Sequence, residues 1–210
     1  MKTKITTVLF DLDGVLINSA KLVSDSFDHT FAAFNMSERF ESISGSGLTI
    51  AEVYGQYTTK DQLLKFMEAH AGFQKNNLHL VTAFEDALST LRILRDKGIH
   101  IGIITNRSMN ARNIIEHCEL TPLVDFVVSV EDVKNPKPHP EEILKAIAHF
   151  DSNPAETIMV GDMPVDIQAG KAAGVITVAT NTSDCLDELK KSHPNHIVQA
   201  LAELIPLFFE

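Results

Sequence analysis

Residues 5–15 read ITTVLFDLDGV, an apolar run that ends in two acids and a glycine. The first six residues are rich in β-formers and carry no charge, which suits a buried strand of a parallel sheet. Asp11 and Asp13 follow with one residue between them, so in extended backbone both carboxylates can leave the same side of the strand end. This stretch predicts a strand that carries chemistry at its carboxyl end.

Three further polar clusters follow in order along the chain. Thr105 and Asn106 come after the apolar run 101–104, and the cluster 161–166, which reads GDMPVD, comes after the run 157–160. Between them lies Lys137, flanked by two prolines that restrict where its ammonium can reach. Open α/β sheets bind ligands beyond the carboxyl ends of their strands, so we expect these clusters to converge in one crevice.

The chain after residue 82 alternates between helical and strand-like patterns. This alternation is typical of an α/β protein with a doubly wound, Rossmann-like parallel sheet and right-handed crossovers. Helices are predicted at 83–97, 108–118, 140–149 and 164–173, and strands at 99–105, 126–129, 157–161 and 175–179.

The segment between the first strand and residue 82 breaks this alternation. It is too long for an unstructured loop, and its apolar residues recur at helical intervals. We therefore expect a small inserted α-helical cap at 17–79 over a core made of 1–16 and 80–210. The stretch Ser44–Gly47, which reads SGSG, lies between the helical parts and is either a specificity loop or a plain turn.

The clusters together fit phosphoryl transfer. Asp11 is the candidate nucleophile, and Asp13 is the candidate proton carrier for the leaving group and for water. A phosphoryl group also needs donors to its oxygens, and Thr105, Asn106 and Lys137 are predicted to supply them.

The acids also fit a Mg²⁺ site, since this ion takes carboxylates, waters and a phosphate oxygen. Asp11, the Asp13 carbonyl and Asp162 form the predicted ligand set, with Asp166 supporting them. The alternative is that these acids cap the helix predicted to begin at residue 164. Capping explains why an acid stands at Asp162 but gives less reason for one at Asp166.

In order and spacing these motifs resemble those of the haloacid dehalogenase superfamily, and the insertion resembles its first-type cap. The phosphoglycolate-phosphatase-like branch fits best. The resemblance implies an enzyme in which Asp11 is the nucleophile, Asp13 the acid/base, Thr105 and Lys137 the phosphate binders, and Asp162 and Asp166 the magnesium groups.

The resemblance also leaves alternatives open. Dehalogenases of the superfamily lack the second acid, so Asp13 favours phosphate chemistry. β-Phosphoglucomutases share Val15, so a β-phosphoglucomutase-like phosphotransferase is an alternative. Those relatives usually carry a cap histidine where this chain has Val23, which favours hydrolysis. A phosphoaspartate signalling module is a further alternative, although a lid-sized insertion has no role in it. Arg107 is predicted either to contact a distal anion of the substrate or to lie on the surface.

The amino-acid composition limits the kinds of molecule that the chain is expected to bind. The chain has 210 residues, 44% of them hydrophobic and 22% charged, and a formal net charge of −10. This balance argues against nucleic acid and suits a small phosphorylated metabolite held by a metal. No window is apolar enough for a membrane span, and Cys118 and Cys185 lack metal spacing, so a cytoplasmic protein with reduced, buried thiols is expected, as a monomer or homodimer.

Overall fold

The computed structural model describes residues 4–43, 48–180 and 185–209, so Ser44–Gly47 lie outside the described residues. Its main sheet has six parallel strands in the order β5-β4-β1-β6-β7-β8. These strands are β1 (Thr7–Phe10), β4 (His100–Thr105), β5 (Phe126–Ser129), β6 (Thr157–Gly161), β7 (Ile176–Thr180) and β8 (His196–Val198). The predicted α/β class and parallel sheet are confirmed.

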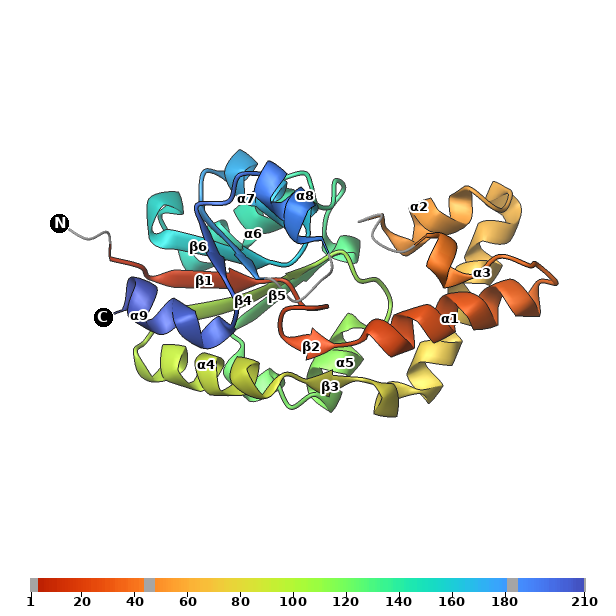
Figure 1. Ribbon diagram of the computed structural model, residues 1–210, viewed down its shortest axis with the longest axis horizontal. Helices are drawn as coiled ribbons and strands as arrows, with labels where there is room; N and C mark the ends of the chain where they lie inside the picture. Colours follow the sequence, from red (N-terminus) through yellow and green to blue (C-terminus); the bar gives the residue numbers. More distant parts are fainter. Residues whose placement is uncertain (1–3, 44–47, 181–184, 210) are drawn as a thin grey trace.

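Helices cover both faces of this sheet. Figure 1 shows α6, α7 and α8 on one side and α4, α5 and α9 on the other. Their bounds are α4 (Glu85–Asp96), α5 (Ala111–His117), α6 (Glu141–Phe150), α7 (Pro164–Ala173), α8 (Leu186–Lys191) and α9 (Leu204–Phe208).

The central strand shows how the sequence builds these layers. All four residues of β1 are buried. Val8 and Phe10 pack into the cluster that includes α4 and α5, whereas Leu9 packs into the cluster that includes α6 and α7. Because successive side chains of a strand alternate between faces, one apolar run serves both layers.

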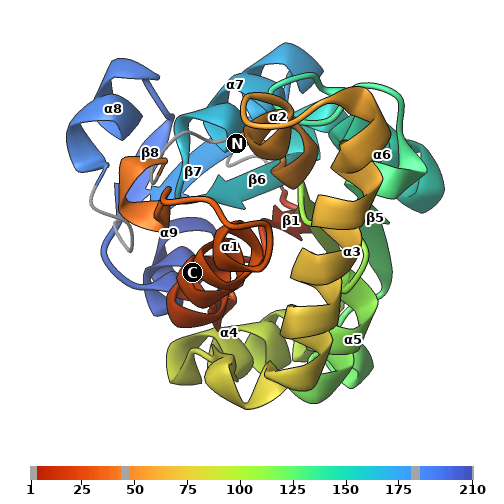
Figure 2. The same cartoon turned by 90° about the vertical axis from the view of Figure 1, so that its right-hand side faces the viewer.

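Three helices stand apart from the sheet beyond its carboxyl ends: α1 (Ala20–Ala33), α2 (Ile50–Gly55) and α3 (Lys60–Asn76). Figure 1 shows them to the right of the sheet, and Figure 2 looks onto them with the sheet behind. They have a hydrophobic cluster of their own, built on Phe27, Phe31, Val53, Tyr54 and Phe66. A short antiparallel pair, β2 (Ile17–Asn18) with β3 (Thr82–Ala83), joins this helical group to the rest of the chain.

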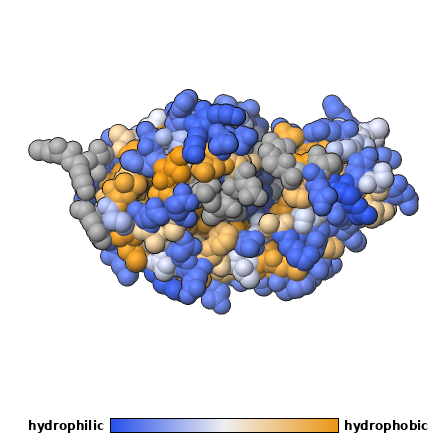
Figure 3. All heavy atoms as spheres, viewed as in Figure 1, coloured by the Kyte–Doolittle hydropathy of each residue, from blue (hydrophilic) through white to orange (hydrophobic). Residues whose placement is uncertain are grey.

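On the face seen in Figure 3, hydrophilic residues interleave with smaller hydrophobic areas, as on most folded proteins. Within the described ranges, every helix is too short or too polar to cross a bilayer.

Several local expectations need correction. The pair β2–β3 and the strand β8 were not predicted, because two or three residues carry too little periodicity. Helix α5 begins after Asn110 and not after Ser108, since Met109 has a positive φ of 61° that interrupts helical backbone. Cys185 is half-buried, whereas Cys118 is buried as expected; both are free thiols.

Candidate active site

The strand order brings three of the predicted clusters together. Asp11 follows β1, Thr105 ends β4 and Asp162 follows β6, and β1 pairs directly with both neighbours. The carboxyl ends of all three strands therefore meet at one edge of the sheet. This is the kind of crevice in which open α/β sheets bind ligands.

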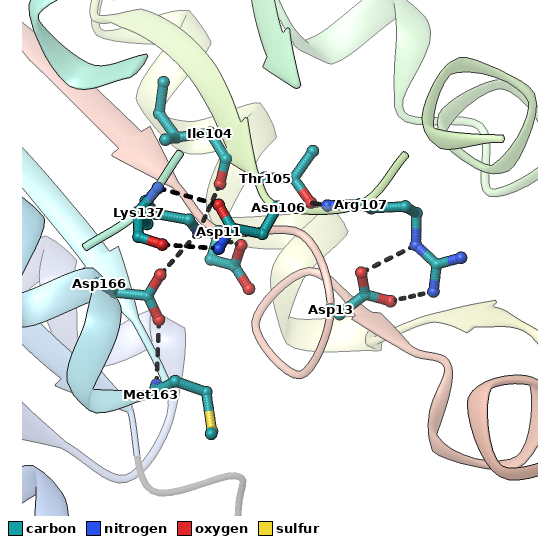
Figure 4. Close-up of polar contacts among 9 residues, drawn as sticks. All are labelled: Asp11, Asp13, Ile104, Thr105, Asn106, Arg107, Lys137, Met163 and Asp166. Carbon is teal, nitrogen blue, oxygen red and sulfur yellow. Dashed lines mark hydrogen bonds and ion pairs between the residues drawn. The ribbon is translucent and has the colours of Figure 1, made fainter. Parts of the chain in front are cut away.

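Lys137 lies between two of the carboxylates. Its Nζ donates to Asp11 Oδ1 at 2.7 Å and to Asp166 Oδ1 at 2.6 Å, as Figure 4 shows. A third bond, of 3.0 Å, reaches the carbonyl oxygen of Ile104. Burial lowers the pKa of Lys137, but the two carboxylates outweigh burial and raise it, so the side chain is an ammonium.

Asp162 completes a cluster of buried acids. One carboxylate oxygen from each of Asp11, Asp162 and Asp166 lies within 4.8 Å of the others. Burial, followed by the charges of Asp11 and Asp166, raises the pKa of Asp162 well above its ordinary value. Burial likewise raises the pKa of Asp11, to about 7, although Lys137 opposes this. If all three carboxylates were ionised they would carry more negative charge than Lys137 neutralises, and the raised pKa values of Asp11 and Asp162 reflect this repulsion together with burial.

Two glycines make room for this cluster. A Cβ on Gly14, where φ is +78°, would lie 2.1 Å from Asp162 Oδ2. A Cβ on Gly161 would lie 2.2 Å from the Cβ of Asp166. No real Cβ tolerates such distances, so glycine at both positions lets the carboxylates approach the backbone closely.

The residues present fit a hard divalent cation. The donors are carboxylate oxygens, which Mg²⁺ prefers, and a 2+ charge would relieve their mutual repulsion. The cluster contains Asp11, Asp162 and Asp166, three of the four predicted metal residues. The carboxylate of the fourth, Asp13, points elsewhere.

Asp13 faces Arg107 in a forked ion pair (Figure 4). Arg107 Nε donates to Asp13 Oδ2 at 2.8 Å and Nη2 donates to Oδ1 at 2.5 Å, while the hydroxyl of Ser19 also donates to Asp13. Burial raises the pKa of Asp13, but the guanidinium more than reverses this and holds it below its ordinary value. The Arg107 side chain is only 3% exposed and that of Asp13 is 31% exposed. Arg107 is therefore not a surface residue.

The hydrogen bonds continue from Arg107 into the helical group. Arg107 Nη1 donates to Gln74 Oε1 at 2.7 Å. This orientation turns Gln74 Nε2 toward His70 Nε2, at 2.9 Å, so the imidazole nitrogen accepts. The proton of His70 is then on Nδ1, which lies 2.7 Å from the Tyr54 hydroxyl. Burial, followed by the charge of Arg107, lowers the pKa of His70 to about 3, which keeps the ring neutral.

Thr105 and Asn106 lie at the same edge with their side chains already in use. The hydroxyl of Thr105 accepts from the backbone N–H of Arg107 at 3.1 Å, and its own proton is free to be donated. The Asn106 amide donates to the carbonyl of Lys137 at 2.9 Å and accepts from its N–H at 3.1 Å. Asn106 thus fixes the backbone of Lys137. A contact between the Asn106 side chain and phosphate stays a prediction.

These groups line a cavity of about 270 Å³ between the sheet edge and the helical group. Asp11, Asp13, Thr105, Arg107, Lys137 and Asp166 line its core side. The opposite side comes from the segment between β2 and β3.

Sequence reasoning missed the roles of Arg107, Gln74 and His70. Arg107 and Asp13 are 94 residues apart, so no local pattern links them. The signal available in the sequence was spacing. His70 and Gln74 are polar and four residues apart, which places them on one face of a helix. In the structure both lie buried on that face of α3.

The chain is similar throughout to known hydrolases. Residues 8–180 match the family model described as haloacid dehalogenase-like hydrolase. Pyrophosphatase PpaX from Bacillus mycoides is 32% identical over 209 residues, covering 97% of each chain, and PpaX from Bacillus pumilus is 32% identical over 215 residues, covering 98% of this chain and 97% of that protein. The solved structure of a predicted phosphoglycolate phosphatase from Haemophilus somnus has a TM-score of 0.85 at 20% identity and covers 97% of both chains.

A doubly wound α/β sheet with buried acids and a lysine in its crevice, together with these relatives, places the chain among the hydrolases. More particularly, this chain belongs to the haloacid dehalogenase-like hydrolase family. The family resemblance drawn from the motifs is confirmed.

Proposed function

We propose that the chain is a Mg²⁺-dependent phosphatase that hydrolyses a small phosphomonoester through an aspartyl phosphate on Asp11. The observation that carries this proposal is the position of Asp11: its carboxylate is buried, bonded to Lys137 and next to Asp162 and Asp166, and it opens into the cavity. The relatives named phosphatase and pyrophosphatase support the same reaction class.

In the first step, a carboxylate oxygen of Asp11 attacks phosphorus and the ester P–O bond breaks. The leaving oxygen takes a proton from Asp13. In the second step, Asp13 removes a proton from water, the water oxygen attacks phosphorus and the Asp11 P–O bond breaks, which releases inorganic phosphate. Lys137 and the Thr105 hydroxyl stabilise charge on the phosphoryl oxygens.

Asp13 must carry a proton in the first step, yet Arg107 holds it ionised in this structure. The phosphate dianion of a substrate next to Asp13 would raise its pKa, since a like charge disfavours ionisation. The ionised form suits the second step, in which Asp13 acts as a base. Arg107 is therefore placed to set the balance between these two states.

The proposed Mg²⁺ would be held by Asp11, the Asp13 carbonyl and Asp162, with Asp166 supporting Lys137 and the cluster. When bound, the ion would neutralise charge on the phosphate oxygens. Residues 17–79 are proposed to act as a cap that excludes water from the cavity, over a core of 1–16 and 80–210.

A β-phosphoglucomutase-like phosphotransferase is the alternative, in which a sugar hydroxyl replaces water. Val23, which stands where those relatives usually carry a histidine, lines the cavity among other apolar residues. That position offers no group to activate a sugar hydroxyl, which favours hydrolysis.

Phosphate release from a panel of phosphorylated metabolites, with Mg²⁺ present, tests the proposal. Wild type is expected to release phosphate from one or a few compounds, and Asp11→Asn, which keeps the shape but loses the nucleophile, is expected to release none. Wild-type release by the purified variant would overturn the role of Asp11, and release unaffected by a chelator would overturn the role of the metal.

A further inference from the structure

We propose that the preferred substrates are phosphomonoesters of uncharged, mainly apolar alkyl or aryl alcohols, and not inorganic pyrophosphate or esters that carry a carboxylate. This inference rests on the proposed function. It concerns the half of the cavity that faces Asp11 across the open space, where the leaving group of a bound phosphate ester would lie.

This half of the cavity is walled by apolar side chains. They come from α1, α2 and the chain between them, and are Val23, Phe27, Phe40, Ile43, Ile50 and Val53. Leu48, which is 42% exposed, completes the wall at its edge. The side chains of these described wall residues offer no hydrogen bond to a charged group, which would lose its hydration against them without compensation. An alkyl or aryl group, in contrast, gains from leaving water there.

The wall is held in place by aromatic packing. The ring of Phe27 lies 4.8 Å from that of His70, 5.2 Å from that of Tyr54 and 5.6 Å from that of Phe40, measured between centroids. Phe27 is also almost fully buried. Neighbours on several sides therefore keep this apolar surface in position.

The polar groups near the wall are already engaged. Gln74 uses its oxygen for Arg107 and one of its two amide N–H groups for His70, and both ring nitrogens of His70 have partners. The neutral imidazole adds no positive charge.

The cations of the cavity are engaged too. The positively charged side chains among its described lining residues are Arg107 and Lys137. Arg107 forms a forked ion pair with Asp13, and Lys137 bridges Asp11 and Asp166. A second phosphate or a carboxylate in the leaving group would have to compete with these aspartates for a positive partner. The PpaX relatives are named pyrophosphatases, which would suggest that pyrophosphate is a preferred substrate. The preference proposed for this chain therefore differs from the one that their name implies.

A matched pair of esters tests the inference. n-Propyl phosphate and glycerol 1-phosphate share a three-carbon chain and differ in two hydroxyls. Wild type with Mg²⁺ is expected to show a kcat/KM at least about tenfold higher for n-propyl phosphate, and higher still for benzyl phosphate. Glycerol is the slightly better leaving group, so intrinsic reactivity works against the expected result. Pyrophosphate and phosphoglycolate are measured beside them and are expected to be the poorest substrates.

A substitution at the edge of the wall provides a second test. Leu48→Arg places a cation beside the leaving group and is expected to reduce the preference for n-propyl phosphate over phosphoglycolate by about tenfold. Leu64→Arg is the matched control, because Leu64 is 61% exposed on α3 and does not line the cavity. It is expected to keep the wild-type preference.

The outcomes separate the inference from the proposed function. A kcat/KM for glycerol 1-phosphate, pyrophosphate or phosphoglycolate that equals or exceeds that for n-propyl phosphate would overturn the inference and leave the phosphatase standing. An unchanged preference in Leu48→Arg would overturn the part assigned to the wall. Release of phosphate from other members of the metabolite panel but from none of these five compounds would overturn the inference alone, whereas release from no compound of the whole panel would overturn the proposed function, and the inference with it.

Discussion

At the scale of single residues, the ion pair between Arg107 and Asp13 is the feature that most affects the proposed chemistry. The guanidinium lowers the pKa of Asp13, and its fork fixes the carboxylate in one orientation. A proton carrier must gain and lose its proton during turnover, so its pKa decides the pH at which the enzyme works.

Replacing Arg107 is therefore expected to shift the pH dependence. Arg107→Met removes the positive charge that lowers the pKa of Asp13, so this pKa should rise. Because kcat/KM reports the first step, in which Asp13 must be protonated, the basic limb of the kcat/KM profile should move to higher pH. The measurement is kcat/KM against pH for wild type and variant. Arg107→Lys, which keeps the charge, should move the limb less, and identical limbs in all three proteins would contradict this role of Arg107.

The residue scale also shows where sequence reasoning reached its limit. Local patterns were enough to expect Asp11, Thr105 and Asp162 at one edge of the sheet, because each lies at the end of a strand. Lys137 lies in the connection between β5 and α6 and reaches the same edge. The hydrogen bonds of Asp13 and Asn106 depend on partners far away in sequence. Helix capping was expected to explain Asp162 better than Asp166, but it is Asp166 whose Oδ2 accepts from the backbone N–H of Met163, at 3.0 Å.

At the scale of elements, prediction succeeded where the pattern was long or sharply bounded. The strands β5 and β6 and the helix α7 have the predicted bounds. Helix α7 is bounded by Pro164 at its first residue and Gly174 after its last, and β6 ends at Gly161. Near the C-terminal end of the described chain, Leu201 and Leu204 are buried, whereas Leu207 of α9 is 36% exposed.

Helix α6 carries an acid in its first turn that faces the core. Glu142 is fully buried, and burial raises its pKa from 4.5 to about 7, with Lys137 opposing and Asp166 adding to the rise. The folded protein therefore binds a proton more tightly here than the unfolded chain does. Its free energy of unfolding should fall as pH rises from about 4.5 to about 7.

Glu142→Gln removes this dependence. The variant is expected to be more stable than wild type at pH 8, by up to about 3 kcal/mol, and the difference should vanish below pH 4.5. Urea denaturation of metal-free protein across this range checks it. A stability difference that is constant with pH would contradict the raised pKa of Glu142.

At the scale of the whole molecule, the clustered acids should link metal binding to folding. Asp11, Asp162 and Asp166 come together only when β1 and β6 are paired and α7 is docked, so the unfolded chain has no such site. A ligand that binds only the folded state stabilises it by mass action.

Adding Mg²⁺ to metal-free protein is thus expected to raise Tm, with a gain of about 2.7 kcal/mol when the free ion is at a hundred times Kd. Asp162→Ala should need a much higher Mg²⁺ concentration for the same rise. Calorimetry at a series of Mg²⁺ concentrations measures both. Equal thermal shifts in wild type and variant would show that the ion binds elsewhere.

The overall architecture was predictable because alternating strands and helices leave few topologies. The contents of the helical group were not, because its apolar residues serve both its own core and the cavity. Phe27, for example, belongs to the cluster with Phe31 and Tyr54 and also lines the cavity. The expectations of a cytoplasmic location, of no nucleic-acid partner and of a monomer or homodimer stay predictions.

The proposed mechanism requires that Asp11 carries the phosphoryl group during turnover. Acid quenching of wild type during hydrolysis of a ³²P-labelled phosphomonoester, followed by peptide mapping, measures this directly. Label is expected on the peptide that contains Asp11, released by hydroxylamine and absent from Asp11→Asn. Label on another residue, or hydrolysis by Asp11→Asn at the wild-type rate, would contradict it.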